Sequence, residues 1–295
     1  HSSKEEVLFR NHDDYNWGFN SYALALYKTE SCSLADAHMS DHRHLISQTD
    51  SPEKMMRINR LSYTRHMNTK YGRRGPLGES ECFITELDGL YRLIAALTYT
   101  MRNALHHGVA ATPFGYRYSS IHALFRKELG KFDLPELMPQ KSQYQYLPEN
   151  MSLPEGFKMD INGLILPESV IDVADVEHQF STARTFLYYM NRLSGEAWEK
   201  EQLQDAVNIP PITLEKMEGN FAFHDLKTML ANEHGRANYN SMTDIQVCDA
   251  IDALLADRSV YCISQSEIER VGRDLYINHH LPQEQINRCL AGRLF

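Results

Sequence analysis

A proline-rich stretch between Lys131 and Pro167 is the feature that most constrains the fold of this 295-residue chain. Five of the eleven prolines fall within it: Pro135, Pro139, Pro148, Pro154 and Pro167. A long helix cannot form there, because each proline removes an amide donor and its ring clashes with the preceding turn. We therefore expect an extended connector at 131–167 between a first domain at 1–130 and a second domain at 168–295.

The first domain shows alternating helical and strand patterns. Helices are expected at 13–28, 51–70 and 88–107, and strands at 35–39, 42–48 and 81–87. The helix at 51–70 begins with a Ser-Pro cap, and Gly108 ends the last one. This order predicts an α+β fold with a ferredoxin-like split βαβ arrangement that lacks its first strand. Either a strand precedes the numbered chain, or the sheet is built differently.

The second domain looks entirely helical, with expected helices at 176–192, 195–206, 211–219, 223–233, 243–256, 265–276 and 282–291. Residues 264–291 form a candidate helix-turn-helix, whose second helix would present polar side chains to base edges. Those side chains are Gln283, Gln285, Asn287 and Arg288. An ordinary helical hairpin is the alternative, and nearby acidic residues favour it. A regulatory or partner-binding role is also open.

The net charge of −9 is distributed unevenly along the chain. Residues 1–131 carry 17 Lys and Arg against 14 Asp and Glu, whereas the remaining 164 residues carry 13 against 25. An anionic partner is therefore best tolerated by the first half. The longest apolar runs are too short to span a bilayer, so we expect no membrane partner. Five cysteines without a CxxC pair favour reduced thiols in a cytoplasmic protein.

His42 and His44 are two residues apart on an expected strand, so both imidazoles point to the same face. This spacing allows two ring nitrogens to bind one divalent ion. The chain contains fourteen histidines, however, and one such pair is expected by chance. Taken alone, the pair is weak evidence for a metal site.

Tyr99 and Asn103 are four residues apart on an expected helix, one turn from each other on the same face. Tyr99 is expected to point away from the apolar stripe that contains Leu97 and Met101. A phenol and a carboxamide oxygen beside a bound metal suit phosphodiester transfer. The simpler interpretation is a surface tyrosine, one of sixteen in the chain.

Four segments, in order, resemble the motifs of the single-tyrosine HUH transposases, in particular the REP-associated-like chromosomal forms. The run 35–46 resembles their strand-turn-strand with two metal-binding histidines, and 97–108 resembles their Tyr-x-x-x-Asn-Pro helix. Residues 63–75 resemble the helix and basic loop, and 114–120 the closing aromatic-Ser-Ser turn. The resemblance covers about residues 10–125. Ser40, Asp41 and Ala104 depart from it, since the family has Pro-Asn before the first histidine and proline after Asn103.

The resemblance implies that Tyr99 attacks a backbone phosphate of single-stranded, hairpin-forming DNA and forms a 5′-phosphotyrosine. His42, His44 and Asn103 would bind Mg²⁺ or Mn²⁺. Asp41 would then either support the metal from its outer shell or weaken the approach of the phosphate. Family members act either alone or as homodimers that exchange the tyrosine helix.

Basic side chains are the candidate contacts to the DNA backbone. They are Arg65, Lys70, Arg73, Arg74, Arg92, Arg102 and, in the candidate helix-turn-helix, Arg288. Each could equally be an ordinary solvated charge. Two other functions stay open. One is a domesticated DNA-binding or regulatory protein that kept the fold without the chemistry, and the other is an unrelated metallohydrolase that activates water.

Overall fold

The computed structural model describes residues 6–78, 83–107, 109–148, 151–191, 242–256 and 258–294. Within these ranges, helices combine with one two-stranded antiparallel sheet, which confirms the α+β class. The strands are β1 (Cys32–His38) and β2 (Arg43–Gln48), and they pair from Cys32 opposite Gln48 to His38 opposite Arg43. The two strands expected from the sequence therefore form a single β-hairpin.

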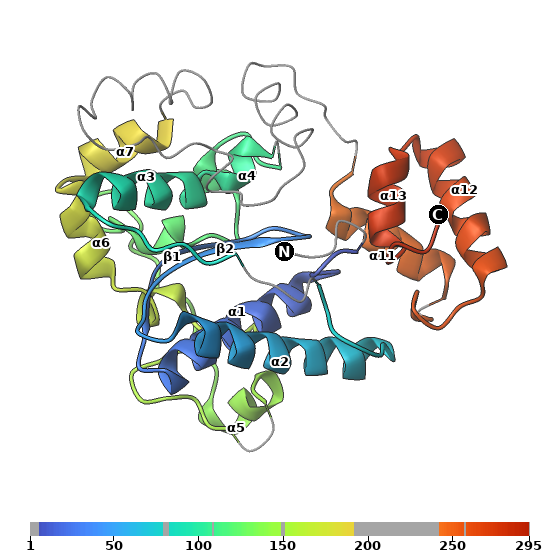
Figure 1. Cartoon of the computed structure of the whole chain (residues 1–295), viewed down its shortest axis with the longest axis horizontal. Coiled ribbons are helices and arrows are strands. Elements are labelled where there is room, and N and C mark those ends of the chain that lie inside the picture. The colour runs from blue at the N-terminus through green and yellow to red at the C-terminus, as the bar shows by residue number, and fades with distance from the viewer. Residues whose placement is uncertain are drawn as a thin grey trace.

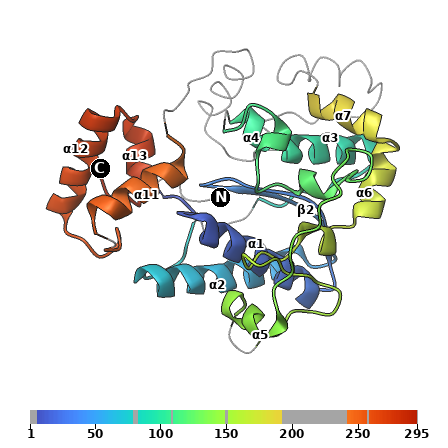
Figure 2. The same cartoon turned by 180° about the vertical axis from the view of Figure 1, so that it is seen from behind.

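Helices cover both faces of this hairpin (Figures 1 and 2). On one face lie α1 (His12–Lys28) and α2 (Pro52–Tyr71), side by side. On the other lies α3 (Leu90–Met101). The side chain of Asn11 caps α1 by accepting a hydrogen bond from the Asp14 amide. Gly72, in the left-handed conformation, ends α2.

Two isolated β-bridges lie on the edge of β1 that does not pair with β2. Ala37 pairs with Ser119 in antiparallel fashion, and Ser33 pairs with Ile171 in parallel fashion. Ser120 strengthens the first contact, because its hydroxyl accepts from the Asp36 amide at 2.9 Å and donates to the Asp36 carbonyl at 3.1 Å. The aromatic-Ser-Ser turn therefore closes one edge of the hairpin.

The strand predicted at 81–87 is wrong for its described part, residues 83–87, which form no strand. Phe83 and Ile84 are 51% and 42% exposed. Their apolar character suggested a strand, but a strand is stabilised by packing against neighbours, and these side chains lie largely in solvent. Residues 81–82 lie outside the described ranges.

Two predicted long helices are each split. The helix expected at 88–107 leaves helical geometry at Arg102, so α3 ends at Met101 and the short α4 (Asn103–His106) follows. The helix expected at 176–192 is interrupted at Ser181, which has a φ of 63°, and forms α6 (Val173–Phe180) and α7 (Ala183–Asn191). The predicted helices at 195–206, 211–219 and 223–233 lie outside the described residues.

In the part of the proline-rich stretch that the structure describes, the one α-helix is the short α5 (Gln140–Gln143). Several apolar side chains of this expected connector are buried in a core that they share with α1, among them Met138, Leu147, Met159 and Ile165. Short 3₁₀ helices complete this part of the chain and the segment before it. They are Pro113–Gly115, Ser120–Ala123, Tyr144–Tyr146 and Pro167–Ser169.

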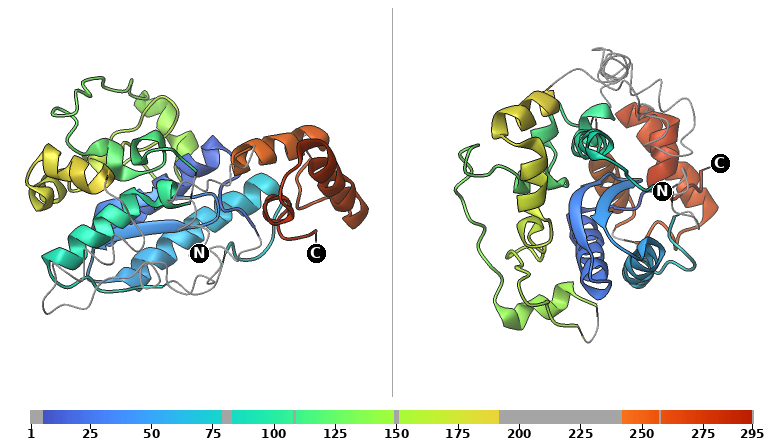
Figure 3. Two further views of the ribbon diagram at one scale, coloured as in Figure 1. Left: turned by 90° about the horizontal axis from the view of Figure 1, so that it is seen from above. Right: turned by 60° about the vertical axis from the view of Figure 1, so that its left-hand side comes forward.

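The helices after the proline-rich segment belong to two separate hydrophobic cores. Helices α6 and α7 share a core with β1 and α3. Helices α11 (Asp244–Leu254), α12 (Gln265–His279) and α13 (Gln283–Cys289) form a core of their own, which Val7 joins. These three helices lie to one side of the hairpin (Figures 1 and 3). None of the helices in the described ranges has the length and apolar character needed to cross a bilayer.

Candidate metal and nucleophile site

His42 and His44 lie at the start of β2, on the face of the hairpin that α3 covers. His42 directly precedes the strand, and its carbonyl accepts a hydrogen bond from the Met39 amide at 2.8 Å, which closes the turn. His44 lies opposite Ala37 in the strand register. The two imidazole centroids are 5.2 Å apart with an interplanar angle of 85°. The predicted same-face placement of the histidines is therefore observed.

Tyr99 and Asn103 approach the two histidines from the helical layer. The Tyr99 ring lies 5.3 Å from the His44 ring, edge to face, and Asn103 Oδ1 lies 3.1 Å from His42 Nε2. Although the helix breaks at Arg102, both side chains still point toward the hairpin. The structure thus brings together all four residues that the sequence selected as nucleophile and metal ligands.

Tyr99 is a buried residue and not the surface tyrosine of the simpler interpretation. Its side chain is 3% exposed, between the ring of His44 and the ring of His106, which stacks on it at 4.9 Å. Leu97, by contrast, packs into the core with β1 and α6. As expected, Tyr99 and Leu97 point to different sides of α3, and the side of Tyr99 is the one lined by histidines.

The hydrogen bonds of His42 determine which ring nitrogen faces Asn103. Asp41 Oδ1 lies 2.8 Å from His42 Nδ1, and a carboxylate there favours a proton on Nδ1. A neutral His42 then turns the lone pair of Nε2 toward the Asn103 carbonyl oxygen, which is also an acceptor. Two acceptors 3.1 Å apart are satisfied by a proton or a cation between them, or by a turn of the Asn103 amide that lets its otherwise unpartnered Nδ2 donate to Nε2.

This arrangement fits a divalent ion. Two adjacent ligands of an octahedral ion, each about 2.1 Å from it, are separated by about 3 Å, which is close to the observed Nε2–Oδ1 distance. His44 Nε2 is buried and has no hydrogen-bond partner among the described residues. The fit depends on the carbonyl oxygen of Asn103, because no three His, Cys, Asp or Glu side chains of the described chain are grouped to hold a metal.

The electrostatics of His44 suit a neutral ligand. Burial lowers the pKa of His44 well below its usual value, and the neighbouring His42 and His107 lower it further. At neutral pH its ring therefore carries no charge and has one nitrogen lone pair free for coordination.

Asp41, a departure from the family pattern, accepts a hydrogen bond from His42 and is ionised. Burial raises the pKa of Asp41, but its pairing with His42 and the charge of Arg288 outweigh this effect and lower the pKa below its usual value. Of the two roles considered from the sequence, this contact agrees with an outer-shell carboxylate that orients a histidine ligand.

His106 and His107 were not selected from the sequence, yet they line the same site. The His107 ring lies 4.7 Å from the ring of His42, and His106 stacks on Tyr99. The signal that could have found them is the His-His pair that follows Asn103 by one helical turn. Tyr99 therefore contacts an imidazole from each of two layers of the fold, His44 from the hairpin and His106 from the helical segment.

The structure places the predicted DNA-contacting residues in different surroundings. Arg65 and Arg74, on α2 and just after it, are exposed. Lys70 instead donates to Asp14 at 2.7 Å and Arg73 to Glu6 at 2.8 Å. Arg92 is half-buried near the start of α3. Arg102 is 2% exposed and donates toward the Tyr189 carbonyl on α7. Its burial leaves Arg102 no surface with which to contact a phosphate.

The candidate helix-turn-helix presents fewer polar side chains than the sequence predicted. Helices α12 and α13 and the turn between them form as expected. Gln285, however, is 3% exposed and donates to Asp244, and Arg288 also pairs with Asp244. Only Gln283 is exposed among the four side chains proposed to read bases; Asn287 and Arg288 are half-buried. The packing of this helix therefore agrees better with an ordinary helical hairpin.

Comparisons with models of known protein families, with curated proteins and with solved structures find no match to this chain.

Proposed function

We propose that this chain is a metal-dependent strand transferase that cuts single-stranded DNA with Tyr99 as nucleophile, in the manner of the HUH transposases that its motifs resemble. The observation that supports this most is the convergence of His42, His44, Asn103 and Tyr99. They come from a hairpin and from a helical segment far away in the sequence, yet they meet with a ligand-like spacing.

The proposed reaction is a transesterification and needs no external energy source. The Tyr99 oxygen attacks a backbone phosphorus, an O–P bond forms, and the bond from phosphorus to the 3′ oxygen breaks. The phenol proton is lost and the leaving 3′ oxygen gains one, so a 5′-phosphotyrosine and a 3′-hydroxyl result. A bound Mg²⁺ or Mn²⁺ would neutralise phosphate charge. His42, His44 and Asn103 would hold that ion, and Asp41 would orient His42.

The burial of Tyr99 sets a condition on this reaction. Because its side chain is 3% exposed, a DNA strand reaches the hydroxyl only after the site opens. The exposed Arg65 lies on α2, and Arg74 follows α2 in the chain, whereas Tyr99 lies on α3, which covers the opposite face of the hairpin. In this proposal they contact a part of the DNA remote from the cleaved phosphate.

We also propose that the hairpin belongs to a ferredoxin-like sheet. Helices α1 and α2 packed together on one face support this arrangement. The outer edge of β2 is the place where a further strand would pair, because β1 is its only strand partner among the residues that the structure describes.

The test is covalent capture on a panel of single-stranded hairpin oligonucleotides with Mn²⁺, followed by denaturing gels. The wild-type chain is expected to form a protein–DNA adduct, and Tyr99→Phe is expected to abolish it while leaving DNA binding intact. Tyr91→Phe, on the same helix, is the matched control and should keep the adduct. An adduct of normal yield in Tyr99→Phe would rule out the proposed nucleophile.

A second candidate function is DNA binding without chemistry, and the enclosed Tyr99 is the observation that favours it. A chain of this kind would bind the hairpins but form no adduct with any of them at any Mn²⁺ concentration. A third candidate, hydrolysis by activated water, would show turnover that survives in Tyr99→Phe.

A further inference from the structure

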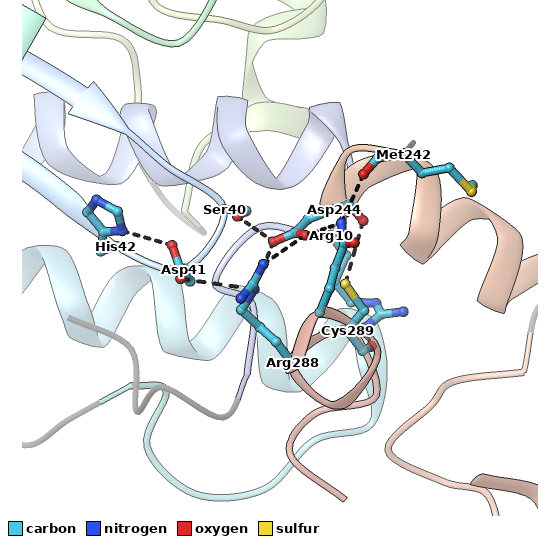
Figure 4. Close-up of polar contacts among 9 residues, drawn as sticks. Arg10, Ser40, Asp41, His42, Met242, Asp244, Arg288 and Cys289 are labelled. Atoms are coloured by element: carbon cyan, nitrogen blue, oxygen red, sulfur yellow. Dashed lines mark hydrogen bonds and ion pairs between the residues drawn. The ribbon is translucent and has the colours of Figure 1, made fainter. Parts of the chain in front are cut away.

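The turn before His42 is held by the C-terminal helices. Asp244, at the start of α11, accepts a hydrogen bond from the Ser40 hydroxyl at 2.7 Å. It also pairs with Arg288 of α13 in a two-pronged contact, with Nε–Oδ2 at 2.9 Å and Nη2–Oδ1 at 3.0 Å. This geometry fixes the plane of the guanidinium. Arg288 is thereby placed next to Asp41 (Figure 4).

Asp41 lies between His42 and Arg288, and its two carboxylate oxygens point in different directions (Figure 4). Oδ1 is 2.8 Å from Nδ1 of His42, and Oδ2 is 4.0 Å from Nε of Arg288. A continuous series of charged contacts therefore runs from α11 and α13 to a ring nitrogen of the candidate metal ligand.

We propose that Arg288 is a positioning residue that acts through Asp41 to fix the tautomer and orientation of His42. The C-terminal helices α11–α13 thereby set the geometry of the candidate metal site. The metal-binding part of this inference rests on the proposed function, whereas the effect on the His42 ring does not.

The physical reason is a balance of charges at Arg288. Its Nε atom has two carboxylates within 4.0 Å, those of Asp41 and Asp244. With the guanidinium between them, both carboxylates are attracted to the same centre. Without its charge they repel each other, and Asp41 is the one free to turn, because Asp244 is also held by Ser40 and Gln285. A turned Asp41 loses its contact with His42 Nδ1, and the ring loses its fixed proton position.

Docking of the C-terminal helices does not depend on Arg288 alone. Val7 is buried in their core, and Arg10 donates to the Cys289 carbonyl at 2.8 Å. At the end of α2, Ser259 donates to the Tyr71 carbonyl. An uncharged residue at position 288 should therefore disturb the contact with Asp41 while the helices stay docked.

The first measurement is the ¹⁵N chemical shifts of the two His42 ring nitrogens in the full chain without metal. The His42 signals are identified as those that disappear in the His42→Gln variant. We expect mainly the tautomer with its proton on Nδ1 in the wild type. Arg288→Gln and Asp41→Ala are both expected to shift the population toward the other tautomer. Arg288→Lys, which keeps the charge, should restore the wild-type shifts. Ser259→Ala removes a docking contact remote from Asp41, the hydrogen bond to the Tyr71 carbonyl, and should leave them unchanged.

The second measurement is the affinity for Mn²⁺ alone, by calorimetry. Asp41→Ala should weaken binding by about tenfold, as loss of an outer-shell partner commonly does, and Arg288→Gln by about threefold. In the double variant the loss should equal that of Asp41→Ala, because Arg288 acts only through Asp41.

The outcomes distinguish the positioning role of Arg288 from the proposed metal-dependent function. If Arg288→Gln leaves both the His42 shifts and the Mn²⁺ affinity of a metal-binding wild type unchanged, the inference is wrong. It is also wrong if Arg288→Gln and Asp41→Ala add fully in the double variant. A wild type that binds no Mn²⁺, but whose His42 tautomer responds to Arg288 through Asp41, would contradict the proposed function and support the inference about His42.

Discussion

His42 Nε2 lies 3.1 Å from Asn103 Oδ1, although the two residues are 61 positions apart and belong to different layers of the fold. The contact exists because α3 packs across the hairpin and the chain breaks at Arg102, which starts a new short helix at Asn103. With the Nδ1 proton of His42 held by Asp41, both atoms of this contact are electron-pair donors. A site built in this way attracts a cation.

Mn²⁺ or Mg²⁺ should therefore stabilise the folded chain. At a hundred times the dissociation constant, binding to the native state adds about 2.7 kcal/mol to the free energy of unfolding. Thermal unfolding with and without Mn²⁺ measures this effect, and His42→Ala with His44→Ala should remove it. His178→Ala, an exposed histidine on α6, is the control and should keep it. Equal stabilisation in the double variant would place the ion elsewhere.

The sequence predicted more of the candidate site than of the fold around it. The two short spacings, from His42 to His44 and from Tyr99 to Asn103, determine which side chains share a face, and local geometry suffices for that. The break of the helix at Arg102 was not predicted, and the burial of the Arg102 side chain was not predictable, because its guanidinium faces the Tyr189 carbonyl of α7, far away in the sequence.

The same limit applies to the C-terminal helices. The starts of α11 and α12 follow from their capping residues, Thr243 and Ser264, which can be read from the sequence. The side chains proposed to read bases were misjudged, since Gln285 and Arg288 find their partner in Asp244, more than forty residues earlier in the chain. Helical periodicity shows which residues share a face but not which acceptor lies opposite them.

Asn20, on α1, forms hydrogen bonds to three backbone groups of the proline-rich segment. Its amide nitrogen donates to the carbonyls of Tyr146 and Gly163, at 3.2 and 2.7 Å, and its oxygen accepts from the Ile165 amide at 2.8 Å. Asn20→Ala leaves these buried backbone groups without their partner and should lower the free energy of unfolding by roughly 2–4 kcal/mol. Urea denaturation measures this loss.

The matched control for Asn20 is Asn16, one turn earlier on α1. It is also buried, but it makes a single bond of this kind, to the Asn162 carbonyl at 2.9 Å. Asn16→Ala should cost about 1 kcal/mol. Equal losses in the two variants would show that the number of backbone partners does not determine the effect.

Asp14 should make stability depend on pH. Burial raises the pKa of Asp14, but the His66 imidazole 3.6 Å from its carboxylate, hydrogen bonds from Lys70 and Tyr71, and the charge of Lys70 outweigh this and lower the pKa below its usual value. Because the folded-state pKa lies below the unfolded one, near 3.9, the contribution of Asp14 is complete above that pH. It is lost as the pH falls through the folded-state value.

The test compares urea unfolding of the wild type and Asp14→Asn between pH 7 and pH 3. The stability difference should stay constant from pH 7 to about pH 5 and shrink below about pH 4. Asp13→Asn, at the exposed neighbouring position, should differ from the wild type far less. A wild-type advantage over Asp14→Asn that grows toward pH 3 would contradict the assigned direction of the pKa shift.

Gly18 lies where α1 passes closest to Phe9. A Cβ atom at this position would be 2.3 Å from Cε1 of the Phe9 ring. The ring cannot move aside freely, because it stacks on Tyr15 at 4.4 Å and contacts Tyr63 at 5.3 Å. Gly18→Ala should therefore lower the free energy of unfolding by about 1–3 kcal/mol, despite the higher helix propensity of alanine.

Gly115→Ala is the control for this substitution, since its Cβ would meet its nearest neighbour, Oγ1 of Thr112, at an ordinary 3.5 Å. We expect it to change stability by less than about 0.5 kcal/mol. The Phe9→Leu background provides a second check. A smaller side chain leaves room for the new methyl group, so Gly18→Ala should cost less there than in the wild type. An unchanged cost in that background would show that the clash with Phe9 is not its cause.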